Sequence, residues 1–151
     1  MTFIEFALSH VGISEVEGTQ ANPEIAKFFD AFPNLPHSDE TPWCSLFLYW
    51  CAKQANLPTP PKDKAPMARS WLHVGVPTDN PQVGDIAIFS RSSSPISGHV
   101  GIYCNQIKDS IFILGGNQKN SVCIKSFPKQ NLIAYRRISS GFNERTSKRG
   151  V

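Results

Sequence analysis

The sequence has no long apolar run and no cationic leader, and these absences exclude two classes of protein. No stretch approaches the roughly 18 consecutive apolar residues that a membrane-spanning helix needs. The first ten residues contain no Lys or Arg and place Glu5 within their apolar pattern, so they do not resemble a signal peptide. We therefore expect a protein that is made in the cytoplasm and has no membrane partner.

The sequence also has no large excess of positive or negative charge. The 15 Lys and Arg residues against 12 Asp and Glu residues leave a formal charge of +3, and three of the cations, Arg145, Lys148 and Arg149, stand close together near the C-terminus. No basic stripe with interleaved aromatic residues is present, which argues against nucleic-acid binding. The mild positive charge would still favour approach to an anionic polymer such as a bacterial cell wall.

Cysteine and histidine residues nowhere occur at the spacing of zinc ligands, so we expect no metal and no cofactor. Cys44 and Cys51 share a predicted helix and stand ~10 Å apart by the helical rise, which is too far for a disulfide. Cys104 and Cys123 fall in predicted strands, where we expect them to be core residues. No disulfide is required.

What the sequence does contain predicts one α+β domain over residues 1–138, followed by a polar and flexible tail over 139–151. Apolar residues at helical spacing come first, and short strand-like segments follow a turn cluster at 80–85. Short turns between strands favour an antiparallel sheet. The predicted helices are 3–11, 22–32, 41–55 and 65–72, and the predicted strands are 85–90, 99–105, 110–114, 121–127 and 132–138.

The helix predicted over 41–55 is the central element. Thr41 can cap it and Pro42 suits its first position, while its nearly uncharged surface predicts burial. Cys44 lies in the first turn, where unpaired N–H groups and the helix dipole lower a thiol's pKa. The backbone N–H groups of Cys44 and Ser45 could also hold a developing oxyanion. The alternative is that Cys44 is a small buried apolar residue.

Two further motifs join this helix. Ser-Gly-His-Val-Gly places His99 at the start of a strand, and Gly-Gly-Asn-Gln places Asn117 at the end of the next strand. In an antiparallel hairpin these two positions are neighbours. A thiol, an imidazole that takes its proton and an amide that orients the ring form a nucleophilic site. Alone, His99 could be a plain hydrogen-bonded residue and Asn117 a turn residue.

The order and spacing of these motifs resemble the papain-like peptidoglycan hydrolases of the NlpC/CHAP superfamily, with similarity from about Phe3 to Arg137. The closest likeness is to a compact subgroup with Trp-Cys and Gly-Gly-Asn-Gln motifs, found in phage lysins and antibacterial secreted effectors. The motifs that carry the resemblance are Trp-Cys-Ser-Leu-Phe at 43–47, Val-Gly-Asp-Ile-Ala-Ile-Phe at 83–89 and Gly-His-Val-Gly-Ile-Tyr at 98–103.

The resemblance implies a papain-like fold, with Cys44 as nucleophile, His99 as general base and acid, and Asn117 as the orienting residue. Many relatives have a glutamate two residues before that asparagine, where this chain has Gly115. This departure favours a Cys-His-Asn set over Cys-His-Glu. The Gly-Asp pair at 84–85 forms a turn in the family, so Asp85 is assigned a structural role.

Five residues are candidates for a substrate groove. For the two tryptophans, packing in the core or in a groove wall is favoured over contact with substrate. The two acidic residues could bind a cationic amine or favour the helix N-terminus. The glutamine could be a further polar contact, although a turn role is favoured. These candidates are Trp43, Trp71, Asp39, Glu40 and Gln118.

The predicted function is amide hydrolysis in peptidoglycan by a monomeric enzyme, either as an N-acetylmuramoyl-L-alanine amidase or as a stem-peptide endopeptidase. The enzyme would act in the periplasm or cell wall, as an antibacterial effector delivered by a secretion apparatus or as a phage lysin. An immunity protein that blocks the groove is an expected partner. One alternative is an acyltransferase or deamidase acting on a protein or lipid. Another is a non-catalytic module that binds the cell wall.

Overall fold

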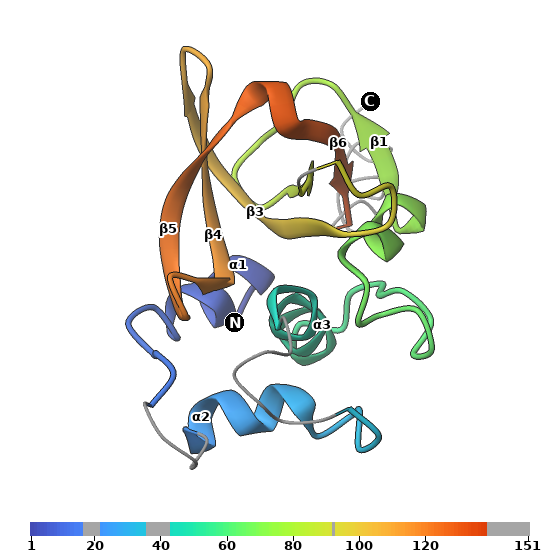
Figure 1. Cartoon of the computed structure of the whole chain (residues 1–151), viewed down its shortest axis with the longest axis vertical. Coiled ribbons are helices and arrows are strands. Elements are labelled where there is room, and N and C mark those ends of the chain that lie inside the picture. Colours follow the sequence, from blue (N-terminus) through green and yellow to red (C-terminus); the bar gives the residue numbers. More distant parts are fainter. Residues whose placement is uncertain (17–21, 36–42, 92, 139–151) are drawn as a thin grey trace.

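The computed structural model describes residues 1–16, 22–35, 43–91 and 93–138. Helical elements fill the first half of the chain and strands the second, which confirms the α+β prediction. In the described residues the strands form one antiparallel sheet with the order β1-β6-β2-β3-β4-β5. Helix α3 lies between this sheet and α2, so that the elements stack in tiers (Figure 1). The predicted tail, 139–151, lies outside the described residues.

The element bounds show where the predictions hold. The helical elements are α1 (Phe3–Leu8), α2 (Pro23–Ala26), η1 (Lys27–Phe29), α3 (Cys44–Gln54), η2 (Ala68–His73) and η3 (Lys129–Asn131). The strands are β1 (Val76–Thr78), β2 (Ile86–Ser90), β3 (Gly98–Ile107), β4 (Ser110–Gln118), β5 (Ser121–Pro128) and β6 (Leu132–Arg137). No helix of the described residues is long and apolar enough to cross a membrane.

Helices α1 and α2 begin at residues whose side chains cap them. Thr2 and Glu5 form a capping box, in which each side chain accepts the other's backbone N–H. Asn22 caps α2 by accepting the N–H of Glu24 at 2.9 Å, and Pro23 takes the first position as predicted. The helices predicted over 22–32 and 65–72 are partly wrong, because much of each forms 3₁₀ turns.

All five predicted strands are present, with two differences. Strand β4 continues to Gln118 and so includes the predicted Gly-Gly-Asn-Gln turn. Strand β1 was not predicted, since it has three residues and contains Pro77. Proline is tolerated there because β1 is an edge strand that pairs only with β6.

The main core lies between α3 and the sheet, where apolar side chains of both are fully buried. A smaller cluster covers the opposite face of the sheet. Cys104 and Cys123 are half-buried; Cys104 packs against the edge of the main core, so the prediction of core residues holds only in part. Asp85 has the structural role expected of it. Its buried carboxylate accepts two hydrogen bonds from Arg137, at 2.8 and 2.9 Å, and ties β2 to β6.

Candidate functional site

Cys44 is the first residue of α3, with Trp43 at the N-cap. The predicted start at Thr41 and Pro42 is therefore too early, and those two residues lie outside the described part of the chain. The first backbone hydrogen bond of the helix runs from the Phe47 N–H to the Trp43 carbonyl. The N–H groups of Cys44 and Ser45 precede it, so they have no partner within the helix. The helix start can therefore offer two donors beside the thiol.

Trp43 anchors the helix start to the helical layer. Its ring stacks on Phe28, with centroids 6.0 Å apart, and its indole N–H donates to the Glu15 carboxylate at 2.6 Å. Only 1% of its surface is exposed. Of the two alternatives for Trp43, the structure therefore shows packing in the core, which was the favoured one, and not contact with substrate.

Ser45 anchors the opposite side of the helix start. Its hydroxyl donates to the Ala65 carbonyl and accepts the indole N–H of Trp71 at 2.8 Å. Trp71 is fully buried. Trp71 therefore also has the packing role that was favoured over substrate contact, and its ring holds α3 against η2.

The same short helix, η2, also holds the loop that leads into β3. Arg69 donates from Nε to the Ser97 carbonyl at 2.8 Å and from a terminal nitrogen to the Ser94 carbonyl at 3.0 Å. Two residues after Ser97 the chain reaches His99. Helix η2 thus positions both the segment that carries the thiol and the segment that carries the imidazole.

His99 is buried at the start of β3, where it pairs with Phe89 of β2. Its ring stacks on Phe127, with centroids 4.7 Å apart and planes inclined by 21°. Ring atom Nε2 lies 2.8 Å from Oε1 of Gln118. The other ring nitrogen, Nδ1, is also buried, and no nitrogen or oxygen of the described residues bonds to it.

The surroundings of Gln118 determine which ring nitrogen of His99 carries hydrogen. The Gln118 amide nitrogen donates to the carbonyls of Cys123 at 2.7 Å and Ile113 at 3.2 Å. These bonds fix the orientation of the amide, so the atom facing His99 is the oxygen, which can only accept. Nε2 of His99 must therefore be protonated. In the neutral ring this leaves Nδ1 as the basic atom.

The structure corrects the prediction of Asn117 as the orienting residue. Continued pairing of β3 with β4 would place Asn117 opposite His99, which is why the motif suggested it. However, β4 contains a bulge, since three steps from Gly115 to Gln118 oppose two steps from Cys123 to Ser121. One extra residue turns Gln118 to the His99 face, and Asn117 takes up a left-handed φ of 56°. No hydrogen bond joins Asn117 to His99 in the described structure.

Gly115 supplies the space that Gln118 occupies. A Cβ at position 115 would lie 2.5 Å from Oε1 of Gln118 and 3.6 Å from Nε2 of His99. A longer side chain at this position would point at the imidazole and exclude the glutamine. The absence of a side chain at 115 and the bulge after it therefore act together. In the sequence, Gly115 followed three residues later by the amide of Gln118 could have indicated that Gln118 orients the imidazole.

Cys44 is fully buried, yet its pKa lies below that of an ordinary thiol. Burial raises the pKa of Cys44, but the charge and hydrogen bonding of His99 outweigh it, helped by the Val100 backbone and the charge of Arg91. Cys51, seven residues along the same helix, provides the contrast, since burial dominates there and raises its pKa. The lowered pKa of Cys44 is therefore caused by the neighbouring imidazole.

The role of Gln118 predicts a specific effect on activity. Gln118→Ala should lower kcat by about 10- to 100-fold with little change in KM, because a ring that turns freely is misplaced for proton transfer. Asn117→Gly, which suits the left-handed backbone, should stay within about twofold of the wild type. Both are measured as rates of fragment release from purified sacculi. Equal losses in the two variants would contradict the assignment.

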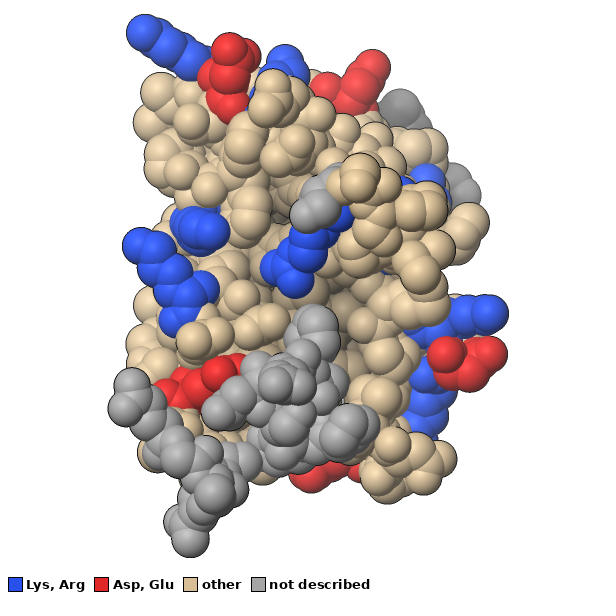
Figure 2. Space-filling model, viewed as in Figure 1, with Lys and Arg blue, Asp and Glu red and all other residues tan. Residues whose placement is uncertain are grey.

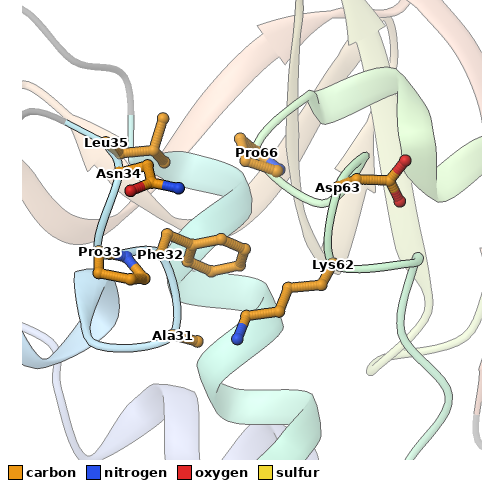
Figure 3. Close-up of a pocket in the computed structure, with 8 residues that line it drawn as sticks. All are labelled: Ala31, Phe32, Pro33, Asn34, Leu35, Lys62, Asp63 and Pro66. Atoms are coloured by element: carbon orange, nitrogen blue, oxygen red, sulfur yellow. The ribbon is translucent and has the colours of Figure 1, made fainter.

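A separate pocket of about 450 Å³ lies between residues 31–35 and the segment that carries Lys62, Asp63 and Pro66. Figure 3 shows Phe32 at its centre, the Lys62 side chain reaching across it and the Asp63 carboxylate turned away. Phe32 also contacts Tyr49 of α3, with ring centroids 5.0 Å apart. The candidate groove residues Asp39 and Glu40 lie outside the described residues, so the structure does not place them. Among the described residues that line this pocket, none has a hydrogen bond or ring contact with His99.

No group of three or more His, Cys, Asp or Glu residues that could hold a metal occurs in the described ranges.

Comparison with known proteins finds a shared fold and a family. A solved structure from Staphylococcus aureus subsp. aureus Mu50, described as similar to lipoprotein, NLP/P60 family, has a TM-score of 0.53 and 18% identity. The alignment covers 91% of this chain and 40% of that one, and it shows a shared fold. A search of curated proteins finds no match.

The CHAP domain family model matches residues 36–117, which is more than half of the chain. The matched region contains both Cys44 and His99 and ends one residue before Gln118. The motif order, the antiparallel sheet and the thiol beside a held imidazole all accord with that match. The chain belongs to the CHAP domain family of peptidoglycan hydrolases.

Proposed function

We propose that this protein hydrolyses an amide bond in peptidoglycan, with Cys44 as nucleophile, His99 as general base and acid, and Gln118 as the residue that positions the ring. The observation that supports this most strongly is that the two ring nitrogens of His99 have different surroundings. Gln118 engages Nε2 and leaves Nδ1 without a nitrogen or oxygen partner. The imidazole lowers the pKa of the Cys44 thiol, and Nδ1 is the ring atom that can accept the thiol proton.

The chemistry follows from these positions. The Cys44 thiolate attacks the amide carbonyl, and the N–H groups of Cys44 and Ser45 stabilise the oxyanion. Nδ1 of the His99 imidazolium donates its proton to the leaving nitrogen, the C–N bond breaks, and a thioester with the acyl group remains. Neutral His99 then takes a proton from water, which attacks the thioester and releases a carboxylic acid. Gln118 accepts the Nε2 hydrogen bond throughout.

Digestion of purified sacculi tests this proposal. New amino termini and free carboxyl groups should appear under reducing conditions, and the fragment masses would distinguish an N-acetylmuramoyl-L-alanine amidase from a stem-peptide endopeptidase. Transfer of an acyl group to an added amine without hydrolysis would favour an acyltransferase. Loss of ammonia from side-chain amides without fragment release would favour a deamidase. Binding to sacculi with no new termini would favour a binding module.

We extend the proposal to an antibacterial effector or a phage lysin that acts on the cell wall from the periplasmic side. The supporting consideration is chemical, since a wall hydrolase reaches its substrate only there. Expression directed to the periplasm should lyse cells, whereas the same level of cytoplasmic expression should not, as measured by culture turbidity. An effector of this kind would need an immunity protein that covers Cys44. Equal growth in the two cases would contradict this role.

A further inference from the structure

The backbone of Glu15 is bound to the hairpin that carries Gln118. Its N–H donates to the carbonyl of Asn120 at 2.8 Å. Gln118 ends β4, and a short turn that contains Asn120 leads from it to β5. The segment before Glu15 makes two further backbone hydrogen bonds with Val122 of β5, both of 2.9 Å. Glu15 is therefore fixed to the turn that directly follows the orienting amide.

The side chain of Glu15 is bound to the helix that carries Cys44. Its carboxylate accepts the indole N–H of Trp43 at 2.6 Å, and Trp43 is the N-cap residue directly before Cys44. An indole has a single N–H and no acceptor, so this bond uses its whole hydrogen-bonding capacity. Only 1% of Trp43 is exposed. Removal of the carboxylate would therefore take away the acceptor of a buried donor.

The other contacts of the Trp43 ring are apolar. Phe28 stacks on the indole with centroids 6.0 Å apart, and a Cβ at Gly116 of β4 would lie 2.7 Å from Cζ3 of Trp43. These contacts confine the ring, but apolar packing has no preferred direction, whereas a hydrogen bond does. The bond to Glu15 therefore fixes how the ring is turned within its packing site.

We propose that Glu15 is a positioning residue that fixes the start of α3 relative to the Gln118 hairpin and so keeps Cys44 aligned with His99. This inference rests on the proposed function. Gln118 orients the imidazole, and Trp43 directly precedes the nucleophile. Glu15 joins the two through its backbone and its side chain, by bonds of 2.8 and 2.6 Å. Reactions between groups held in this way are sensitive to small displacements.

The test compares Glu15→Ala and Glu15→Gln in the release of fragments from purified sacculi. Glu15→Ala should lower kcat by about tenfold with KM within about twofold of the wild type, because a displaced nucleophile impairs the reaction more than binding. Glu15→Gln keeps an oxygen acceptor at the same reach and should restore kcat to within about threefold of the wild type. Circular dichroism gives the folded fraction of each variant. A purely structural role would lower that fraction and leave kcat per folded molecule unchanged.

A double-mutant cycle with Trp43→Phe isolates the hydrogen bond. Phenylalanine keeps an aromatic ring but has no N–H. Glu15→Ala should therefore change kcat by less than about twofold in the Trp43→Phe background, whereas it costs about tenfold in the wild-type background. The difference between the two backgrounds is the coupling that the bond provides.

Glu24→Ala is the matched control for loss of a carboxylate. The Glu24 side chain is exposed and pairs with Lys27 at 2.7 Å. The acidic side chains on the face shown in Figure 2 lie toward the upper end, the lower half and the right edge rather than in one patch. Removal of one exposed carboxylate should therefore change the surface field very little. This variant should keep the wild-type kcat and KM.

The remaining outcomes would contradict the inference in distinct ways. A wild-type kcat in folded Glu15→Ala would overturn it and leave the hydrolase proposal standing. Equal losses in Glu15→Ala and Glu15→Gln, or equal effects of Glu15→Ala in the two backgrounds, would show that the bond to Trp43 does not carry the effect. Absence of release by the wild type would remove the proposed function, and the inference with it.

Discussion

Cys44→Ala should lower fragment release from sacculi by at least about 10⁴-fold, because loss of the nucleophile removes the acyl-enzyme route altogether. The fold should remain intact, since the change removes one sulfur atom at the first residue of α3. The anchors of the helix start are the side chains of Trp43 and Ser45, which the substitution leaves in place. The measurement is the initial rate of fragment release, with far-UV circular dichroism to confirm folding.

The control for this prediction is Cys104→Ala. Cys104 lies on β3, the strand that also carries His99, and is half-buried, so the variant tests loss of a thiol from the same strand but outside the proposed chemistry. It should retain activity within about twofold of the wild type, since a change away from the reacting groups is expected to be nearly neutral. If Cys44→Ala still released fragments while retaining its fold, the assignment of the nucleophile would be wrong.

Removal of His99 should slow alkylation of Cys44 at neutral pH by more than about tenfold, because only about 3% of an unperturbed thiol is ionised there and burial lowers that fraction further. The sign follows from the two opposing causes. Burial raises the pKa of Cys44 and His99 lowers it, with a lowered pKa as the net result. In the wild type, the thiolate therefore persists as the pH falls below the usual range of a thiol. In His99→Ala burial acts without that opposition, so the midpoint moves to higher pH.

The measurement is the rate of iodoacetamide labelling from pH 5 to pH 9, read at the peptide that contains Cys44 by mass spectrometry. Cys51 serves as the internal control, because burial raises its pKa and its thiol is fully covered in the same helix. It should stay unlabelled across this range in both proteins. Identical pH profiles for Cys44 in wild type and His99→Ala would contradict the thiolate–imidazole pair.

The parts of the site that were predictable from sequence depend on local rules. A cysteine at the start of an apolar helix and a histidine at the start of a strand are placed by helix capping, periodicity and short turns. These rules gave α3 within two or three residues of its start and β3 within one. They favoured packing over substrate contact for the tryptophans at 43 and 71 but could not separate the core from a groove wall, because that depends on how the layers pack.

The third residue of the site was beyond such rules. A two-residue repeat along β4 predicts Asn117 at the face of His99, and a single bulge replaces it with Gln118. The bulge follows from the left-handed backbone at Asn117 and from the space at Gly115. The bulge and the space at Gly115 depend on how β4 pairs with its neighbouring strands and cannot be inferred from the sequence of β4 alone. The orienting residue is therefore decided by tertiary register.

Helix η2 contacts both sides of the catalytic pair without contributing a reacting group. Trp71 binds the start of α3 through Ser45, and Arg69 binds the loop before His99. A displacement of the helical layer relative to the sheet would therefore carry the sulfur and the imidazole in the same direction. The distance between the Cys44 sulfur and the His99 ring should thus change little when the two layers move relative to each other.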